Sequence, residues 1–135
     1  MGKFQSTKLF DGFSCVFRQW KAKNTHCRFM HGYGVSFRVW FEGSLDERNW
    51  VWDFGGMKRA QTKIDGMSPK AWMDYMFDHT ILVAKDDPML NLINDLEHNQ
   101  IAQVRIVEAT GAEKFAEFIF GKLNKFVQTE TDGRV

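Results

Sequence analysis

The chain has 135 residues, of which 44% are hydrophobic, 26% charged and 15% aromatic. This length and balance predict one soluble globular domain and exclude a disordered chain. The net charge is +1 and no long basic run is present, so no nucleic-acid partner is expected. No apolar run approaches the ~20 residues of a membrane span, and the N-terminus lacks the apolar core of a signal peptide. We therefore expect a cytoplasmic protein with no membrane partner.

The first half of the chain predicts two strands joined by a loop. In the first, Phe13, Cys15 and Phe17 fall on one face, and the second alternates apolar and polar residues throughout. Two long antiparallel strands with one apolar face each need a covering layer of helices or a second sheet. The predicted strands cover Thr7 to Trp20 and Tyr33 to Glu42, with a loop over 21–32 and a short extended piece over Asn49 to Asp53.

Helices are predicted to supply that cover. Ser68-Pro69 and Asp87-Pro88 each place a capping side chain before a proline, which is typical of a helix start. Thr110 and Glu113 have the spacing of a capping box, in which two side chains bind each other's backbone N–H groups. The predicted helices cover Phe54 to Ile64, Pro69 to Phe77 and Asp87 to about Glu97, and a last helix follows Thr110.

The second half also contains strand signals. Ile81 to Ala84 is a brief apolar run, and Gln103 to Glu108 alternates and is partly β-branched, which predicts a third strand. Thr131 to Arg134 is typical of a turn into a fourth strand. We therefore expect a single domain over 1–135 whose last strand is cut short at the C-terminus.

Three clusters carry reactive side chains: His26-Cys27 with His31, the pair Asp78-His79, and the acids Glu108 and Glu113. Cys, His and Asp together can transfer a proton or act as a nucleophile, because the imidazole accepts a proton and the carboxylate orients it. Each cluster also has a structural interpretation. A Cys and a His can be buried packing residues, His79 can end a helix, Glu113 can cap one, and Glu108 can be a solvated carboxylate.

A metal site is a further alternative for the loop. His26, Cys27 and His31 are possible ligands, but a stable catalytic zinc site normally has three protein ligands and no second paired set follows.

The order of these motifs resembles the 6-pyruvoyl-tetrahydropterin synthase and 6-carboxy-tetrahydropterin synthase family. The motifs are Cys27-x-x-x-His31-Gly32-Tyr33, then Asp53-Phe54, then Asp78-His79, and then a capped helix with Glu113 and Ala116. The resemblance covers nearly the whole chain. It implies an α+β tunnelling fold, with an antiparallel four-stranded sheet and helices packed on one face. It also implies assembly of a homo-oligomer, as a trimer or as a hexamer of two stacked trimers.

The resemblance further implies a lyase that breaks a carbon–oxygen or carbon–carbon bond in dihydroneopterin triphosphate or a related pterin. Pathways of this kind include queuosine biosynthesis and biopterin or folate-related metabolism. By resemblance, Cys27, Asp78 and His79 match the proton-transfer residues of the family. Thr110 and Glu113 are candidate substrate-binding residues, although the family's pterin-holding Thr falls near Gly111 and its anchoring Glu is expected beyond Val135.

Zinc is the cofactor that the resemblance implies, and here the sequence departs from the family. The family binds zinc through three His, one on the first strand and two in a His-Gly-His motif. This chain has Phe17 at the first position and Tyr33 at the last, so only His31 matches, with His26 as a possible substitute. An alternative is therefore a zinc-free member: a Cys-dependent enzyme acting on another pterin or purine-like molecule, as tunnelling-fold nitrile reductases are, or a non-catalytic pterin-binding oligomer.

Overall fold

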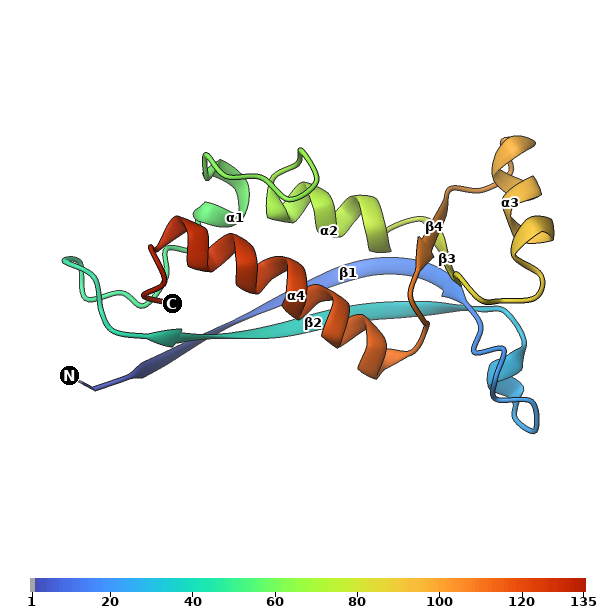
Figure 1. Cartoon of the computed structure of the whole chain (residues 1–135), viewed down its shortest axis with the longest axis horizontal. Coiled ribbons are helices and arrows are strands. Elements are labelled where there is room, and N and C mark those ends of the chain that lie inside the picture. The colour runs from blue at the N-terminus through green and yellow to red at the C-terminus, as the bar shows by residue number, and fades with distance from the viewer. Residues whose placement is uncertain (1) are drawn as a thin grey trace. The chain divides into compact units, whose positions relative to one another are not determined.

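Strands and helices alternate along residues 2–135, the part of the chain that the computed structural model describes (Figure 1). Two long strands come first, and the remaining strands are short and separated by helices. The elements in chain order are β1 (Phe4–Phe17), the 3₁₀ helix η1 (His26–Arg28), β2 (His31–Gly43), α1 (Gly56–Arg59), α2 (Pro69–Phe77), β3 (Thr80–Ala84), α3 (Leu90–His98), β4 (Val104–Val107) and α4 (Ala112–Glu130).

The strands form one four-stranded sheet in the order β2-β1-β3-β4. The predicted α+β class and the four-stranded sheet are therefore confirmed, but an entirely antiparallel sheet is not. β3 is parallel to β1, where Cys15 pairs with Thr80, and parallel to β4, where Ile81 pairs with Val104. The parallel pairing of β3 with β4 follows from their connection. The helix α3 carries the chain back between these two strands, and a helical crossover of this kind joins parallel strands.

The chain divides into two compact units, which we describe separately. β1, β2, α2 and α4 each contribute residues to both units. Unit 1 comprises the residues up to Asp11, Ser36–Trp72 and Ile119–Val135, and unit 2 comprises Gly12–Val35 and Met73–Phe118.

Unit 2 contains the reactive residues, and its core confirms the alternation predicted for the first strand. Phe13, Cys15 and Phe17 are all buried, at 2%, 3% and 6% exposure. The edge of the Phe115 ring from α4 meets Phe17, with centroids 4.9 Å apart, and Phe115 also meets Phe77 of α2 at 5.5 Å. Two helices therefore cover the apolar face of β1 in this unit, as predicted.

Unit 1 has its own aromatic core. Trp52 is buried, stacks on Phe41 of β2 at 5.9 Å and meets the ring of Phe126 from α4 edge-on at 6.0 Å. Trp50 is half-exposed, with the Arg48 guanidinium over its ring. These contacts give Trp52 a packing role.

The middle of the chain is less regular than predicted. The short extended piece over Asn49 to Asp53 joins no sheet, and a turn lies at its start, where the Asp46 carboxylate accepts the backbone N–H groups of Arg48 and Trp50. The helix predicted over Phe54 to Ile64 shrinks to α1, which has four residues. Gly56 is needed there, since a Cβ at that position would lie 2.7 Å from the Trp52 ring, but glycine costs a helix about 1 kcal/mol.

The remaining elements fall close to their predicted positions. α2 has the predicted bounds, and the apolar run after it is the strand β3. β1 begins and ends three residues earlier than predicted, and α3 begins after Asp87, which accepts the N–H of Met89. No strand follows α4 within the described residues, since residues 131–133 form a turn closed by Gly133 donating to Gln128. The sheet still has four strands, because the apolar run predicted over Ile81 to Ala84 lies in the strand β3.

None of the helices in residues 2–135 combines the length and apolar character needed to cross a lipid bilayer.

Candidate functional site

Asp78 and His79 lie at the junction of α2 and β3 in unit 2. His79 has a positive φ of 59°, which turns the chain from the helix into the strand, and its backbone N–H donates to the Ser14 carbonyl at 2.6 Å. The Ser14 N–H in turn donates to Asp78 Oδ1 at 3.1 Å. Asp78 Oδ2 lies 3.1 Å from His79 Nδ1, and the imidazole is 79% exposed. A carboxylate anchored on β1 therefore orients an accessible imidazole.

Cys27 lies in η1, the turn before β2. The Thr25 hydroxyl accepts the Cys27 N–H at 3.1 Å and so caps this short helix, and the Cys27 carbonyl accepts the N–H of Gln19 at 2.7 Å. The thiol is partly exposed. Within residues 2–135, no hydrogen bond joins Cys27 to His79.

A stack of aromatic rings occupies the positions that the resemblance assigns to zinc. The rings of Phe17 and Tyr33 lie 4.1 Å apart and nearly parallel, at 13°, and the rings of Tyr33 and His31 lie 4.5 Å apart. Partial burial, together with the nearby thiols of Cys27 and Cys15, raises the pKa of the Tyr33 phenol. The phenol therefore stays protonated at neutral pH.

These residues do not fit a three-histidine zinc site. Phe17 offers only carbon, and Tyr33 packs flat against it. His31 donates from Nδ1 to the Phe29 carbonyl at 3.1 Å, which leaves Nε2 as its one available ligand atom. Across residues 2–135, no three His, Cys, Asp or Glu side chains are grouped closely enough to hold a metal ion, and His26 does not complete such a set.

Arg18 connects the parts of this region and was missed by the sequence analysis. Its guanidinium binds both carboxylate oxygens of Asp87, with Nε at 2.8 Å and Nη2 at 2.5 Å, and Nη1 donates to the Arg28 carbonyl. Asp87 is 1% exposed, and the hydrogen bonds from Arg18 hold the pKa of its carboxyl below the usual range. The Arg18 carbonyl accepts the Thr110 hydroxyl at 2.6 Å. One arginine therefore ties η1, the start of α3 and the loop before α4 to the end of β1.

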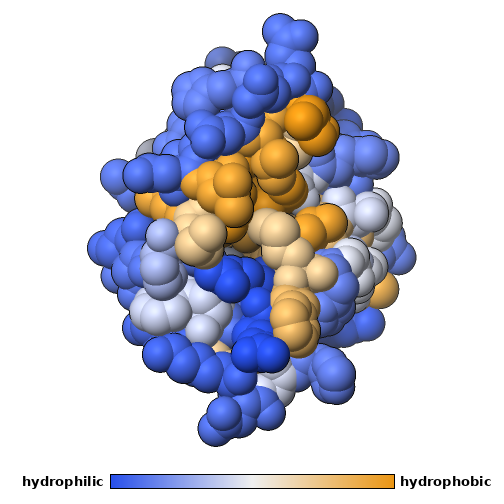
Figure 2. All heavy atoms as spheres, turned by 90° about the vertical axis from the view of Figure 1, so that its right-hand side faces the viewer, coloured by the Kyte–Doolittle hydropathy of each residue, from blue (hydrophilic) through white to orange (hydrophobic). Residues whose placement is uncertain are grey.

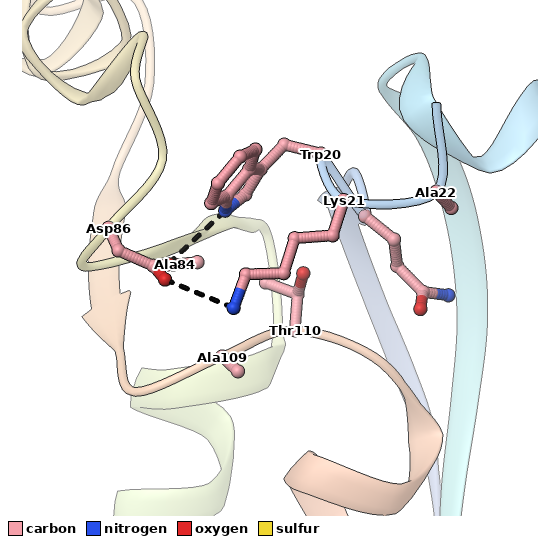
Figure 3. A pocket seen from close by; sticks show the side chains of 8 residues that line it. Trp20, Lys21, Ala22, Ala84, Asp86, Ala109 and Thr110 are labelled. Atoms are coloured by element: carbon pink, nitrogen blue, oxygen red, sulfur yellow. Dashed lines mark hydrogen bonds and ion pairs between the residues drawn. The ribbon is translucent and has the colours of Figure 1, made fainter. Parts of the chain in front are cut away.

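A pocket of about 350 Å³ opens beside this arginine (Figure 3). One wall carries an indole and an ammonium group that both bind one carboxylate: Trp20 Nε1 donates to Asp86 Oδ1 at 3.2 Å, and Lys21 Nζ lies 3.4 Å from Asp86 Oδ2. Gln19 and Thr110 line it as well, so the pocket touches the loop that holds Cys27. Its lining residues are Gln19, Trp20, Lys21, Ala22, Ala84, Asp86, Ala109 and Thr110.

Thr110 and Glu113 do not form the predicted capping box. The Thr110 hydroxyl donates to Arg18 and lines the pocket, while Glu113 is an exposed residue in the first turn of α4. Glu108, directly after β4, pairs with Lys85 at 2.6 Å, which lowers the pKa of the Glu108 carboxyl. The structure thus places Thr110 and not Glu113 at the pocket. The only sequence signal for the pocket is the polar run after the first predicted strand, because spacing alone does not show that this run meets Asp86 and Thr110.

The comparisons with known proteins agree with the fold. The family model of 6-pyruvoyl tetrahydropterin synthase matches residues 7–135. The crystal structure of an uncharacterized protein from Wolinella succinogenes has the same fold, with a TM-score of 0.77 and 19% sequence identity, over 97% of this chain and 88% of that one. A search among curated proteins gives no significant match. Since the family model spans nearly the whole sequence, the chain belongs to the 6-pyruvoyl tetrahydropterin synthase family.

Proposed function

We propose that the protein is a tetrahydropterin-synthase-like lyase that acts on dihydroneopterin triphosphate or a related pterin. The observation that carries the proposal is the Asp78–His79 pair, an exposed imidazole held by a carboxylate that β1 itself anchors. His most often performs general acid–base catalysis, because its pKa lies close to neutral pH.

The pair has the geometry that proton transfer from a ligand requires. The Asp78 carboxylate accepts the proton on His79 Nδ1, so the Nε2 atom is left to take a proton from a carbon or hydroxyl of the substrate. The carboxylate then stabilises the imidazolium that forms. We assign the second proton transfer to Cys27. In this proposal, the Asp78–His79 pair that acts together with the thiol comes from a partner copy of the chain.

The pocket beside Arg18 is our proposed site for the pterin ring. Its volume of about 350 Å³ falls within the range of small-molecule sites. The Trp20 indole provides an aromatic wall, and the Asp86 carboxylate and Thr110 hydroxyl provide polar groups for the edge of a heterocycle. Glu108, at the end of the last strand β4, is the residue that we propose in place of an anchoring Glu beyond Val135.

A second candidate function is supported by the Phe17–Tyr33 stack. Loss of the metal ligands removes an electrostatic stabiliser of the oxyanion or enolate formed during the family's reaction. The protein would then act on another pterin or purine-like molecule through Cys27, or would bind such a molecule without turning it over.

We propose that the chain assembles as a homo-oligomer, a trimer or a hexamer. Figure 2, which faces the side where α3 lies, shows apolar side chains gathered on this surface. Large exposed apolar patches are typical of protein interfaces. Light scattering that gave the mass of a single chain would contradict the assembly. The large apolar side chains of unit 2 that are exposed include Phe29, Met89, Leu92, Ile101 and Ile106.

The test of function is turnover of dihydroneopterin triphosphate by the wild type, by Cys27→Ala and by Thr129→Ala, a control on the exposed end of α4. Product formation by the wild type that is lost in Cys27→Ala and retained in the control supports the lyase. Equal rates for the wild type and Cys27→Ala would exclude a role for the thiol. Tight binding of the pterin, seen by fluorescence without any turnover, would favour the second candidate.

A further inference from the structure

His31 has the hydrogen bond that usually supports a metal-binding histidine, although the other two histidines of such a site are absent. In metal sites, a ligating imidazole usually donates its second N–H to a carbonyl or carboxylate, which fixes the ring. His31 Nδ1 has this partner in the Phe29 carbonyl, two residues before it. The arrangement leaves Nε2 free to bind a ligand, so His31 is built as a metal ligand would be.

The rings at positions 17 and 33 lie beside His31 in one row, with Tyr33 in contact with both Phe17 and His31. Three imidazoles around a tetrahedral zinc with bonds of about 2.0–2.1 Å have ring centroids roughly 5 Å apart. The rings at positions 17 and 33 lie 4.1 Å apart, and those at 33 and 31 lie 4.5 Å apart. Side chains from β1 and β2 therefore lie next to one another in the order 17, 33, 31, with each neighbouring pair closer than two imidazoles on one zinc would be.

The stack itself leaves no space for an ion. Two rings at 4.1 Å and 13° are in van der Waals contact over their faces, and the Phe115 edge packs against Phe17. Ring packing therefore fills the place beside His31 that an ion would need.

We propose that this position is a metal-free aromatic stack, and that two side chains, Phe17 and Tyr33, are all that separates it from a three-histidine zinc site. His31 is the retained ligand, and the carbonyl of Phe29 still holds it. The proposal rests on the geometry of these residues and does not depend on the substrate proposed above.

The test is zinc uptake by the full chain. Wild type and the double variant Phe17→His/Tyr33→His are dialysed against zinc, then against buffer, and the metal is measured by elemental analysis. We expect under about 0.1 zinc per chain for the wild type and about one for the double variant, because three imidazoles make a complete protein ligand set. Co²⁺ in the double variant should give the visible bands of four-coordinate cobalt.

Two further variants keep the test decisive if a histidine at the buried position 17 prevents folding. Tyr33→His alone creates a two-imidazole site and should compete for zinc with a coloured chelator at least about tenfold better than the wild type. Tyr33→Phe keeps the stack and should bind no zinc. Near-stoichiometric zinc in the wild type would overturn the proposal. So would a folded double variant that takes up no zinc, since the three positions would then not converge on a metal.

Discussion

Two regions of unit 2 differ in the chemistry that their side chains can perform. At the α2–β3 junction, Asp78 and His79 form an anchored, exposed pair suited to moving protons. At the start of β2, Phe17 and Tyr33 form an apolar stack where a metal would polarise oxygen atoms. The first region is held by backbone hydrogen bonds and the second by ring packing. The comparison indicates that neighbouring parts of one unit can differ in kind, one offering groups that exchange protons and the other only rings that pack.

The strongest test of the Asp78–His79 region is removal of its imidazole. His79→Asn should lower the rate of pterin turnover by about 10²- to 10⁴-fold, the usual contribution of a general acid–base group. Asparagine tolerates the positive φ at this position, so the fold should be unchanged. Steady-state kinetics, with circular dichroism as the control for folding, check the result. A rate within twofold of the wild type would remove His79 from the mechanism.

Substitutions in the Phe17–Tyr33 stack should change the free energy of unfolding. Phe17→Ala leaves a cavity between Tyr33 and Phe115 and should cost about 3–5 kcal/mol of unfolding free energy. Tyr33→Phe retains the ring and should change stability by less than about 1 kcal/mol. Urea unfolding measures both. If the two variants were equally destabilised, the stack would depend on the phenol hydroxyl and not on ring packing.

The ion pair beside the pocket can be tested at Asp87. Asp87→Asn removes the charge opposite Arg18 and should cost about 2–3 kcal/mol at pH 7. The pKa of Asp87 is lowered in the folded chain, so the wild-type advantage should be full above about pH 4 and should be lost as the pH falls further. Thermal unfolding of both proteins between pH 7 and pH 3 gives the comparison. A constant difference across this range would contradict the ion pair as its cause.

The smallest effect is expected at the pocket. Thr110→Val removes the hydroxyl that donates to the Arg18 carbonyl and should cost about 1 kcal/mol. Because Thr110 lines the pocket, pterin binding should weaken as well, whereas Thr129→Val on the exposed end of α4 should leave binding unchanged. Fluorescence titration distinguishes the two variants. Unchanged binding in Thr110→Val would place the pterin elsewhere.

Local chemistry explains which parts of the fold were predictable. Strict alternation predicted the buried face of β1, and the Ser68-Pro69 start predicted α2 with its bounds. The helix predicted over Phe54 to Ile64 failed because Gly56 is needed for a contact with the Trp52 ring, which periodicity does not show. The parallel pairing of β3 was also hidden, since the sequence shows neither strand order nor direction.

The candidate site was predictable where its residues are neighbours in the sequence. Asp78 and His79 are adjacent, and their pairing follows from one turn of backbone. Arg18, Asp86 and Thr110 come from three separate segments, and only the fold brings them to one pocket. Their roles depend on contacts between residues nearly 70 or more positions apart, for which the sequence carries no local signal.

The two cysteines of this chain differ in exposure, so their rates of alkylation can measure how often the structure opens locally. Burial, and then the charge of Asp78, raise the pKa of the Cys15 thiol to about 11, whereas Cys27 lies partly exposed in η1. An alkylating reagent near neutral pH should therefore label Cys27 at once and Cys15 only when the helices that cover its face of β1 move away. The lag between the first and second mass additions would report the rate of that local opening.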